Sequence, residues 1–264
     1  MRSSPSVRWI RRPGAGGAEG CRPSGSWGRA AGSLVAALTA AGWESAGLLG
    51  RADDLTTAAA GVDLLVLATP DAAIGEVAAR VDPVPTTVVA HLSGATGLDV
   101  LGPHVRRASV HPLVSLPDVE VGARRLRGAW FAVATEPSAA SLVHRLVDDL
   151  GGRSFPVAAE DRATYHAAAA VASNHLVALL GQVARLADAI GVPLEAYLDL
   201  AAGSLDNVRT VGPSAALTGP AARGDEATVA AHLAALPAGE RATYRALAAE
   251  ARRLAGRVQP GGGR

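Results

Sequence analysis

Between about residues 30 and 157, short apolar runs alternate with helical segments, and this alternation restricts the fold more than any other feature of the chain. The clearest run is "VDLLVLATP" (62–70), an unbroken apolar stretch typical of a strand buried on both faces. Further strands are predicted in "SAGLLGR", "TTVVAHLSG", "ASVHPL", "GAWFAVAT" and "RSFPV". Helices are predicted in "GSLVAALTAAGW", in "DAAIGEVAARV" and over residues 137–150. Strands that alternate with helices in this way form a parallel α/β sheet.

After about residue 158 the strand-like runs end, and alanine- and leucine-rich helices are predicted over 160–190, 194–209, 225–235 and 238–257. The segment "GPSAALTGPAARGD" (212–225) is predicted to be a loop between helices. The pattern therefore predicts an α/β Rossmann-like parallel-sheet domain over residues 26–157 and an all-α C-terminal domain over 158–257. Residues 258–264 are expected to form a disordered tail.

Composition excludes several kinds of chemistry. All 25 basic residues counted as Lys or Arg are arginine, so no lysine can form a Schiff base or act as an acid. The single cysteine, Cys21, excludes an internal disulfide and fits a reducing cytoplasm. A formal net charge of +1 without a basic stripe argues against nucleic acid as a partner. The seven histidines lack metal-ligand spacing, so no metal site is expected.

The longest apolar run, "AAAAVASNHLVALLGQVARL", is interrupted by polar and charged residues. We therefore expect a buried helix and no membrane span. The start of the chain is basic but lacks the apolar core of a secretory signal. These observations predict a cytoplasmic protein.

The stretch "GSWGRAAGSL" (25–34) resembles half of a dinucleotide-binding turn, G-x-G-x-x-G/A. Counting back from the helix end at Gly42 places Ser26, Gly28 and Ala31 at the three glycine positions, and Arg29 between them, so the turn is predicted at 26–32. Such residues would line the pyrophosphate at a helix N-terminus. A small-residue linker without function remains the alternative.

A rival match, "GAGGAEG" (14–20), begins with G-x-G but is followed by Cys-Arg-Pro-Ser-Gly, which does not start a helix. The segment "EGCRPSG" contains Pro23 and no β-branched run, so it is a poor strand. Residues 1–25 are therefore expected to be irregular and to leave the sheet without a normal first strand. A frameshift or start-site artefact is one explanation, and true loss of the strand is the other.

Residues at the ends of two expected strands also point to the dinucleotide. Arg51 ends the second expected strand, where a dinucleotide domain contacts the adenosine ribose, and an arginine there can pair with the 2′-phosphate of NADP. The alternative is a solvated arginine beside Asp53 and Asp54. Thr69 and Pro70 end the clearest strand and are expected beside the dinucleotide.

Polar residues also end the neighbouring strands: His91 with Ser93 and Gly94, and Ser109 with His111. In a parallel sheet such ends meet at one edge, where ligands bind. On the first helix of the second domain, His166, Ala170 and Asn174 are four residues apart and are predicted to share a face. Ser93, His111, His166 and Asn174 are the candidate catalytic residues; the alternatives are structural histidines and an asparagine that pins core helices.

Several segments together resemble a known family. They are "VDLLVLATPDAAIGEVA", "HLSGATGLDVL", "SVHPLVSL", "LRGAWFAVA", "DRATYHAAAAVASNHLVALL", "LDNVRTVGPSAALTGPAARGDEATV" and "HLAAL". The chain resembles Rossmann-like proteins with a DUF2520 C-terminal domain, a helical domain like that of 6-phosphogluconate dehydrogenase. The resemblance runs from about residue 26 to 257. The family is akin to pyrroline-5-carboxylate reductases, F420-dependent NADP reductases and β-hydroxyacid dehydrogenases.

The resemblance implies an NADP-dependent oxidoreductase, dimeric through its helical domain. Its reaction would be hydride transfer to the carbonyl or imine of a small carboxylated metabolite, with ketopantoate as one candidate. The lysine that β-hydroxyacid dehydrogenases carry four residues before the asparagine is replaced by Ala170. His111, His166, Tyr165 or a water would then supply the proton. The alternatives are a non-catalytic or inactive dinucleotide-binding protein and an F420-dependent NADP reductase.

Overall fold

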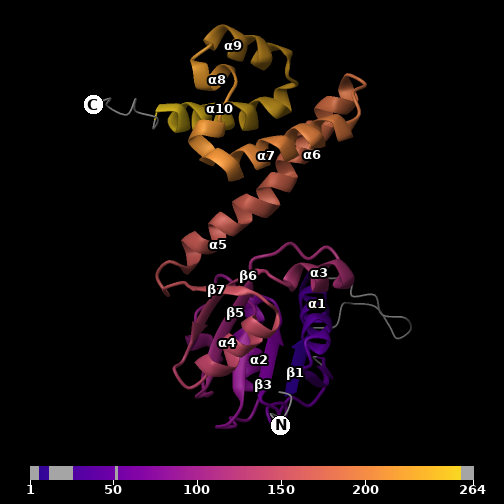
Figure 1. Cartoon of the computed structure of the whole chain (residues 1–264), viewed down its shortest axis with the longest axis vertical. Coiled ribbons are helices and arrows are strands. Elements are labelled where there is room, and N and C mark those ends of the chain that lie inside the picture. The colour runs from indigo at the N-terminus through magenta and orange to yellow at the C-terminus, as the bar shows by residue number, and fades with distance from the viewer. Residues whose placement is uncertain (1–5, 12–25, 51–52, 257–264) are drawn as a thin grey trace. The chain divides into compact units, whose positions relative to one another are not determined.

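A computed structural model describes residues 6–11, 26–50 and 53–256 of the chain (Figure 1). The side chains of residues 6–11, 26 and 27 are outside this description. The chain divides into two compact units, Met1–Ser173 and Asn174–Arg264, and each is described by itself.

The first unit contains a seven-stranded sheet in the order β2-β1-β3-β4-β5-β6-β7. Strands β1 to β5 are parallel, which confirms the predicted α/β class. The strands are β1 (Ser6–Arg11), β2 (Glu44–Leu49), β3 (Leu64–Ala68), β4 (Val88–His91), β5 (Arg107–Pro112), β6 (Trp130–Thr135) and β7 (Arg153–Pro156).

Strand β6 runs antiparallel to β5, and β7 then follows β6 in parallel, which the prediction of a wholly parallel sheet missed. The backbone N–H of Leu113, just after β5, donates to the carbonyl of Trp130 at the start of β6 (2.8 Å). The intervening segment, with α3 (Val119–Leu126), thus returns to the edge of the sheet from which it left. Strand β6 starts at the edge where β5 ends, and it therefore runs antiparallel to β5.

Strand β1 overturns the prediction that residues 1–25 leave the sheet without a first strand. It pairs with β2 on one side, starting at Ser6↔Glu44, and with β3 on the other, starting at Val7↔Leu64. The sequence "SVRWIR" contains valine, tryptophan and isoleucine, which favour strands, but its arginines hide that signal. Pairing on both sides stabilises the strand.

The order of the strands reverses at β1 and β3, because β2 lies on one side of β1 and β3 on the other. In open α/β sheets ligands bind outside the carboxyl ends of the strands at such a switch point. The carboxyl ends of β3, β4 and β5 lie along the same edge as this point because these strands are parallel.

Helix α1 (Ser26–Ala40) corrects the predicted glycine turn, because residues 26–32 form the first turns of this helix. Ala31, Leu34 and Leu38 are buried in the core at helical spacing, which fixes this stretch as helix. Residues 12–25, which connect β1 to α1 in the chain, lie outside the described residues. The rejected match "GAGGAEG" (14–20) falls in this connection, the place where dinucleotide-binding domains carry their glycine fingerprint.

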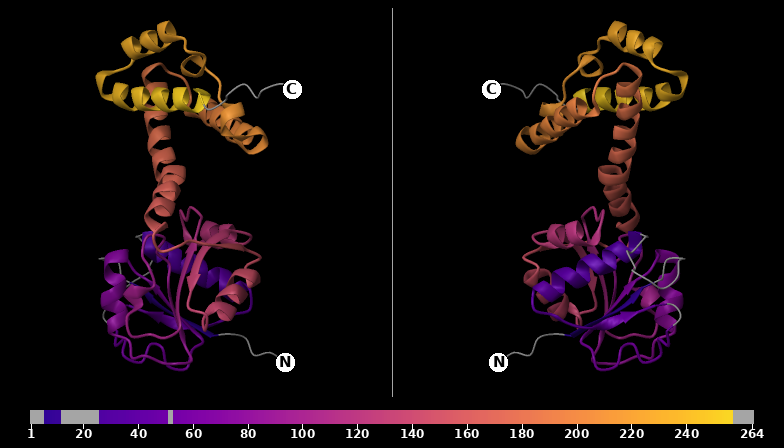
Figure 2. Two further views of the ribbon diagram at one scale, coloured as in Figure 1. Left: turned by 90° about the vertical axis from the view of Figure 1, so that its left-hand side faces the viewer. Right: turned by 90° about the vertical axis from the view of Figure 1, so that its right-hand side faces the viewer.

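Helices cover both faces of the sheet (Figure 2). In β3 the side chains alternate between two apolar cores: Leu64 and Val66 join the core with α1 and α4 (Ala140–Asp149), whereas Leu65 and Leu67 join the core with α2 (Ile74–Ala79). This two-sided burial is the reason that "VDLLVLATP" is apolar throughout.

Helices α1 and α3 cross at two glycines. A Cβ on Gly122 would collide with Ser33 Oγ, and a Cβ on Gly32 would lie 2.8 Å from Val119 Cγ2. Arg29 of α1 also donates from Nε to the carbonyl of Leu116 (3.2 Å). The close approach holds the segment after β5 against α1.

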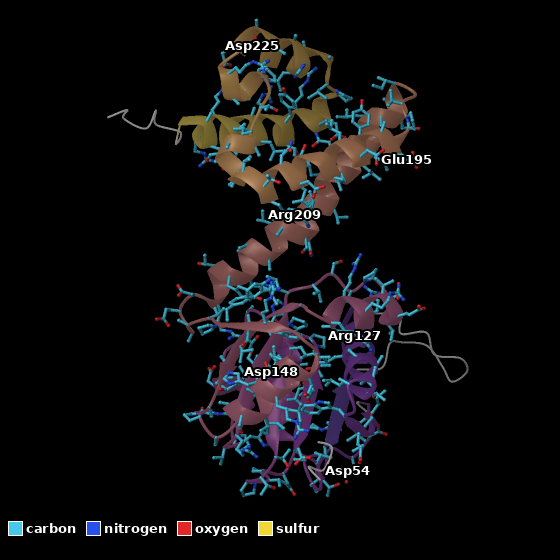
Figure 3. All side chains as sticks on the ribbon, viewed as in Figure 1. Asp54, Arg127, Asp148, Glu195, Arg209 and Asp225 are labelled. Atoms are coloured by element: carbon cyan, nitrogen blue, oxygen red, sulfur yellow. The ribbon has the colours of Figure 1, made fainter. Side chains whose placement is uncertain are left out.

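The remaining elements are helical, as predicted. They are α5 (Arg162–Ala170), a π turn (Val171–His175), α6 (Leu176–Ala189), α7 (Leu194–Ala216), α8 (Pro220–Arg223), α9 (Glu226–Ala235) and α10 (Arg241–Gly256). The side chain of Asp225 caps α9 by accepting from the backbone N–H of Thr228 (3.0 Å; Figure 3).

The segment 212–225, predicted to be a loop, is partly helical. Gly212 breaks α7 with φ 79° and ψ 164°, after which the helix resumes at Pro213. Gly219, also at positive φ, precedes Pro220 at the first position of α8. In both cases the glycine takes a conformation that other residues avoid, and the proline starts the next helix.

The expectation that the long apolar helix is buried is wrong for the described residues. The continuous helix Arg162–Ala189 has a mean hydropathy of 1.4 and the length to cross a membrane, yet only 6% of its apolar window is buried within the molecule. Its charged Arg185 forms a two-bond ion pair with Glu240 (2.7 and 3.0 Å), and Gln182 donates to the Glu240 carbonyl (2.9 Å). Other faces of α6, including Val177, remain exposed.

Candidate functional site

Three of the predicted polar clusters lie at one edge of the sheet. Leu67 of β3 pairs with His91 of β4, and His91 pairs with Ser109 of β5. Thr69 and Asp71 follow β3 at the same edge. The sequence expectation that these strand ends meet is confirmed by this register.

His91 is a structural residue. Its ring is fully buried, Nε2 donates to the carbonyl of Gly97 (3.1 Å), and Nδ1 accepts from the backbone N–H of Ser93 (3.2 Å). Burial lowers the pKa of His91 to about 4, so the ring is neutral at neutral pH. The turn that follows is closed by Ser93 Oγ, which accepts from the backbone N–H groups of Ala95 and Thr96.

Arg162, at the start of α5, was not among the predicted site residues. Its side chain is 4% exposed, and Nη2 donates to the carbonyl of Ser93 (3.0 Å) and to Ser109 Oγ (2.5 Å). No carboxylate of the described residues forms an ion pair with it, and its buried Nε lacks a partner there. Burial lowers the pKa of Arg162, but a guanidinium keeps its charge in proteins. The edge of the sheet thus contains a buried cation without an ion-pair partner among the described residues, and Asp71 attracts it from beyond ion-pair distance.

Two histidines and a tyrosine lie beside this cation. The hydroxyl of Tyr165 lies 2.5 Å from His111 Nδ1, and the rings meet edge to face at 5.5 Å between centroids. The ring of His166 lies 6.1 Å from that of His111. Burial lowers the pKa of His111 to about 4, and electrostatic interactions with His166 and Arg162 act in the same direction, whereas Asp71 acts against them. Burial also raises the pKa of Tyr165, so both groups are neutral at neutral pH.

The residue after Ser93, Gly94, lies close to both imidazole rings. A Cβ at this position would lie 2.9 Å from His111 Cε1 and 3.0 Å from His166 Cδ2. The turn after β4 therefore touches both imidazoles with its backbone, and only glycine leaves room for them.

Asn174 differs from its prediction in two ways. It lies in the π turn that follows α5, so the exact four-residue repeat with His166 and Ala170 is interrupted. It is exposed within the described chain, which contradicts the alternative of an asparagine that pins core helices. Its assignment to the second unit leaves its catalytic role a prediction.

The predicted cofactor residues fall into three groups. Gly28, Arg29 and Ala31 lie in α1, where Ala31 is fully buried. Thr69 is buried and Pro70 partly exposed at the carboxyl end of β3. The side chain of Ser26 and the whole of Arg51 lie outside the described residues. Their roles toward a dinucleotide stay predictions.

The sequence supplied Ser93, His111 and His166, and the structure adds Arg162 to them and brings Tyr165 onto His111. A signal for Arg162 existed, because it precedes His166 by four residues and so shares its helix face. The predicted face begins only at His166 and so leaves out Arg162.

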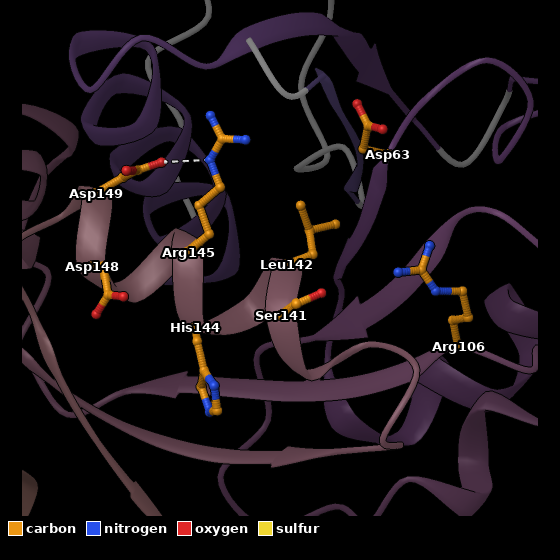
Figure 4. Close-up of a pocket in the computed structure, with 8 residues that line it drawn as sticks. All are labelled: Asp63, Arg106, Ser141, Leu142, His144, Arg145, Asp148 and Asp149. Carbon is orange, nitrogen blue, oxygen red and sulfur yellow. Dashed lines mark ion pairs between the residues drawn. The ribbon is translucent and has the colours of Figure 1, made fainter. Parts of the chain in front are cut away.

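A pocket of about 710 Å³ lies elsewhere, between α4 and the amino ends of β3 and β5 (Figure 4). Arg106, on its rim, donates to the carbonyl of Ser138, and Arg145 pairs with Asp149 (3.5 Å). Both arginines thus bind groups of the protein itself. The pocket lies at the edge of the sheet opposite to the carboxyl ends of the parallel strands. Among the described residues, no three His, Cys, Asp or Glu side chains are grouped closely enough to hold a metal ion.

Comparisons with known structures agree with this architecture. A Bacteroides fragilis protein assigned as an NADP oxidoreductase has a TM-score of 0.74 at 18% identity, over 95% of this chain and 98% of the other. Pyrroline-5-carboxylate reductase from Streptococcus pyogenes has a TM-score of 0.61 at 14% identity, over 95% and 99%. An imine reductase from Pseudomonas sp. has a TM-score of 0.58 at 16% identity, over 95% and 94%. Identities this low establish the fold alone.

No curated protein matches the sequence. Two family models do: a Rossmann-like domain matches residues 31–117, and DUF2520, a domain of unknown function, matches residues 129–251. Together they span strands β2 to β7, the polar edge and most of the helices that follow. The chain therefore carries a Rossmann-like domain followed by a DUF2520 domain.

Proposed function

We propose that the protein is an NADPH-dependent reductase that transfers hydride to the carbonyl or imine of a small carboxylated metabolite, such as ketopantoate. The observation that carries this proposal is the polar cluster of Ser93, His111, Arg162, Tyr165 and His166 at the carboxyl edge of the sheet. In doubly wound sheets this edge is where a dinucleotide and its substrate meet. The named activities of the three similar structures support a nicotinamide cofactor.

The charge of the cluster favours such a reaction. Hydride transfer to a carbonyl builds negative charge on its oxygen, and a fixed cation stabilises that charge best where water is excluded. Arg162 is buried and has no carboxylate as an ion-pair partner among the described residues, so its charge is available to a ligand. The same cation would also attract the carboxylate of a carboxylated substrate.

For the cofactor, we assign Ser26, Gly28 and Arg29 at the start of α1 to the pyrophosphate and Arg51 to the 2′-phosphate, whereas Ala31 is buried in the core and is not assigned to the pyrophosphate. Thr69 and Pro70 would lie beside the dinucleotide, since they follow β3 at the switch point. Ser93, His111, His166 and Asn174 would surround nicotinamide and substrate.

Titration of the purified protein with NADPH tests the cofactor. We expect saturable quenching of NADPH fluorescence and at least about tenfold weaker binding of NADH, which is the effect of one charge-assisted contact worth about 1.4 kcal/mol. Arg51→Glu should abolish this preference. Absence of saturable binding would refute the cofactor assignment, and equal affinity for NADH and NADPH would refute the role of Arg51 alone.

Turnover separates the proposal from its alternatives. The panel consists of pyruvate, ketopantoate, 1-pyrroline-2-carboxylate and 1-pyrroline-5-carboxylate, each with NADPH. A non-catalytic or inactive binder would quench NADPH fluorescence but would not oxidise NADPH with any of the four compounds. An F420-dependent enzyme would instead exchange hydride between reduced F420 and NADP.

We also propose a cytoplasmic homodimer formed through the helical unit, without a membrane or nucleic-acid partner. Leu198, Leu205 and Val208 recur on one side of α7 and are 40%, 47% and 39% exposed. An exposed apolar stripe of this kind is typical of an interface. The ion pair of Arg185 with Glu240 favours a protein partner over a lipid one for the neighbouring α6.

Sedimentation equilibrium tests the dimer. Leu205→Glu should weaken self-association at least about tenfold, because it places a charge in an apolar contact. Thr210→Glu, which adds the same charge on another face of α7, should leave the dimer intact. A wild-type protein that stays monomeric at micromolar concentration would contradict the proposal.

A further inference from the structure

The contact between His111 and Tyr165 is a hydrogen bond between a ring nitrogen and a phenol. A neutral imidazole has one N–H donor and one acceptor nitrogen. The Tyr165 hydroxyl lies 2.5 Å from Nδ1, and we infer that it donates to an unprotonated Nδ1, an arrangement in which Nε2 carries the hydrogen. Nε2 has no hydrogen-bond partner among the described residues, and it is not one of their fully buried, unpartnered polar atoms. A ligand at the edge of the sheet can therefore reach the Nε2–H group.

The neutrality of His111 limits how it can act as an acid. Its pKa is lowered to about 4 by burial and by nearby cations, so an imidazolium is scarce at neutral pH. A neutral imidazole can release the Nε2 proton only if Nδ1 takes up another proton at the same time. The group placed to supply that proton is the Tyr165 hydroxyl.

Arg162 provides the counter-charge for this transfer. It precedes Tyr165 by three residues on α5, and the two attract each other: the guanidinium lowers the pKa of Tyr165 against the larger effect of burial, which raises it. Arg162 has no competing ion pair among the described residues. A transient tyrosinate would therefore be formed beside a buried cation that has no ion-pair partner among the described residues.

We propose that His111 and Tyr165 form a proton relay to the bound substrate, an inference that rests on the proposed reductase function. NADPH gives a hydride to the carbonyl or imine carbon, and the electron pair of the C=O or C=N bond takes the proton from His111 Nε2. Nδ1 takes the phenolic proton at the same time and leaves a tyrosinate. Nδ1 then returns that proton to Tyr165, and Nε2 takes one from water.

The helical unit contains a matched pair for comparison. The hydroxyl of Tyr244 lies 2.6 Å from His232 Nδ1, with the rings edge to face at 5.8 Å. This pair joins α9 and α10 and has no part in the site. Tyr244→Phe removes the same hydroxyl from the same kind of contact, so it controls for loss of a tyrosine–histidine hydrogen bond as such.

The kinetic test uses NADPH and whichever panel compound the wild-type protein reduces fastest. Tyr165→Phe should lower kcat by about 10²-fold, the lower end of general acid catalysis, with KM and NADPH affinity changed by less than about threefold. Tyr244→Phe should retain wild-type kcat. Phenol, but not toluene, should restore turnover to Tyr165→Ala, because only phenol returns the proton donor and both fill the space.

An NMR measurement on the unliganded protein tests the geometry without turnover. The ¹⁵N shifts of the His111 ring should report a neutral Nε2–H form at pH 7, with Nδ1 altered by Tyr165→Phe. A protonated Nδ1 would overturn the relay whatever the activity. Turnover unaffected by Tyr165→Phe, or restored equally by toluene, would overturn the relay and leave the reductase proposal standing. A wild-type protein that reduces no panel compound would overturn both.

Discussion

Acidification from about pH 7 to about pH 4.5 is expected to lower the unfolding free energy of the unit Met1–Ser173 by on the order of 5 kcal/mol. The cause is that His91 and His111 are held neutral in the folded protein, where burial lowers each pKa to about 4. In the unfolded chain a histidine has a pKa of about 6.5. Between these values the unfolded state binds the extra proton, so stability rises with pH and is lost as the pH falls.

The geometry explains why protonation is costly at His91. Its Nδ1 accepts from the backbone N–H of Ser93, so a proton on Nδ1 would face another donor. The Arg162 guanidinium adds repulsion, and Asp71 and Asp99 act in the opposite direction with smaller effects. The hydrogen bond from the backbone N–H of Ser93 to His91 Nδ1 cannot survive in the charged form.

Urea unfolding followed by tryptophan fluorescence measures this effect in the correct unit, because Trp9, Trp27, Trp43 and Trp130 all lie within residues 1–173. Exposed carboxylates also titrate in this range, so the comparison is with His111→Asn. That variant should lose roughly half of the pH dependence, because one of the two buried imidazoles is gone. If the unfolding free energy changed equally with pH in the wild-type protein and in His111→Asn, the buried neutral state of His111 would be contradicted.

Phe131→Ala is expected to lower the unfolding free energy of the same unit by about 3–5 kcal/mol. Among the described residues, Phe131 is the largest side chain that is fully buried, and it lies in the core between the sheet and helices α1 and α4. Its ring packs on the backbone of Gly152, where a Cβ would lie 2.7 Å from Cε2. Because the ring is held on all sides, its removal leaves a cavity that the neighbours cannot fill.

Phe155→Ala provides the matched control, since these two are the only phenylalanines of the chain. Phe155 is half-buried and contacts the rings of Trp130 and Tyr165, at 6.1 and 5.9 Å between centroids. We expect a loss of about 1 kcal/mol for this variant, in line with a partly exposed position. Urea midpoints that shift equally in the two variants would show that Phe131 is not the centre of the core.

Much of the architecture followed from the sequence because burial leaves a periodic pattern. The unbroken run of β3 predicted a strand covered on both faces, and two apolar cores meet on that strand. The loss of strand patterns after about residue 158 predicted the helical domain. The first strand was not predicted, because the arginines in "SVRWIR" interrupt the apolar pattern. Its place in the sheet depends on hydrogen bonds to β2 and β3.

The sequence by itself determined which residues end the strands of the sheet, and so predicted that Ser93, Ser109 and His111 meet at one edge. Only the tertiary structure decided what completes that edge. Arg162 reaches Ser93 across 69 positions, and Tyr165 reaches His111 across 54. Periodicity identifies the buried face of a helix but not the strand end against which that face packs. The buried cation and the tyrosine–histidine pair therefore exist only because α5 folds back onto the carboxyl ends of β4 and β5.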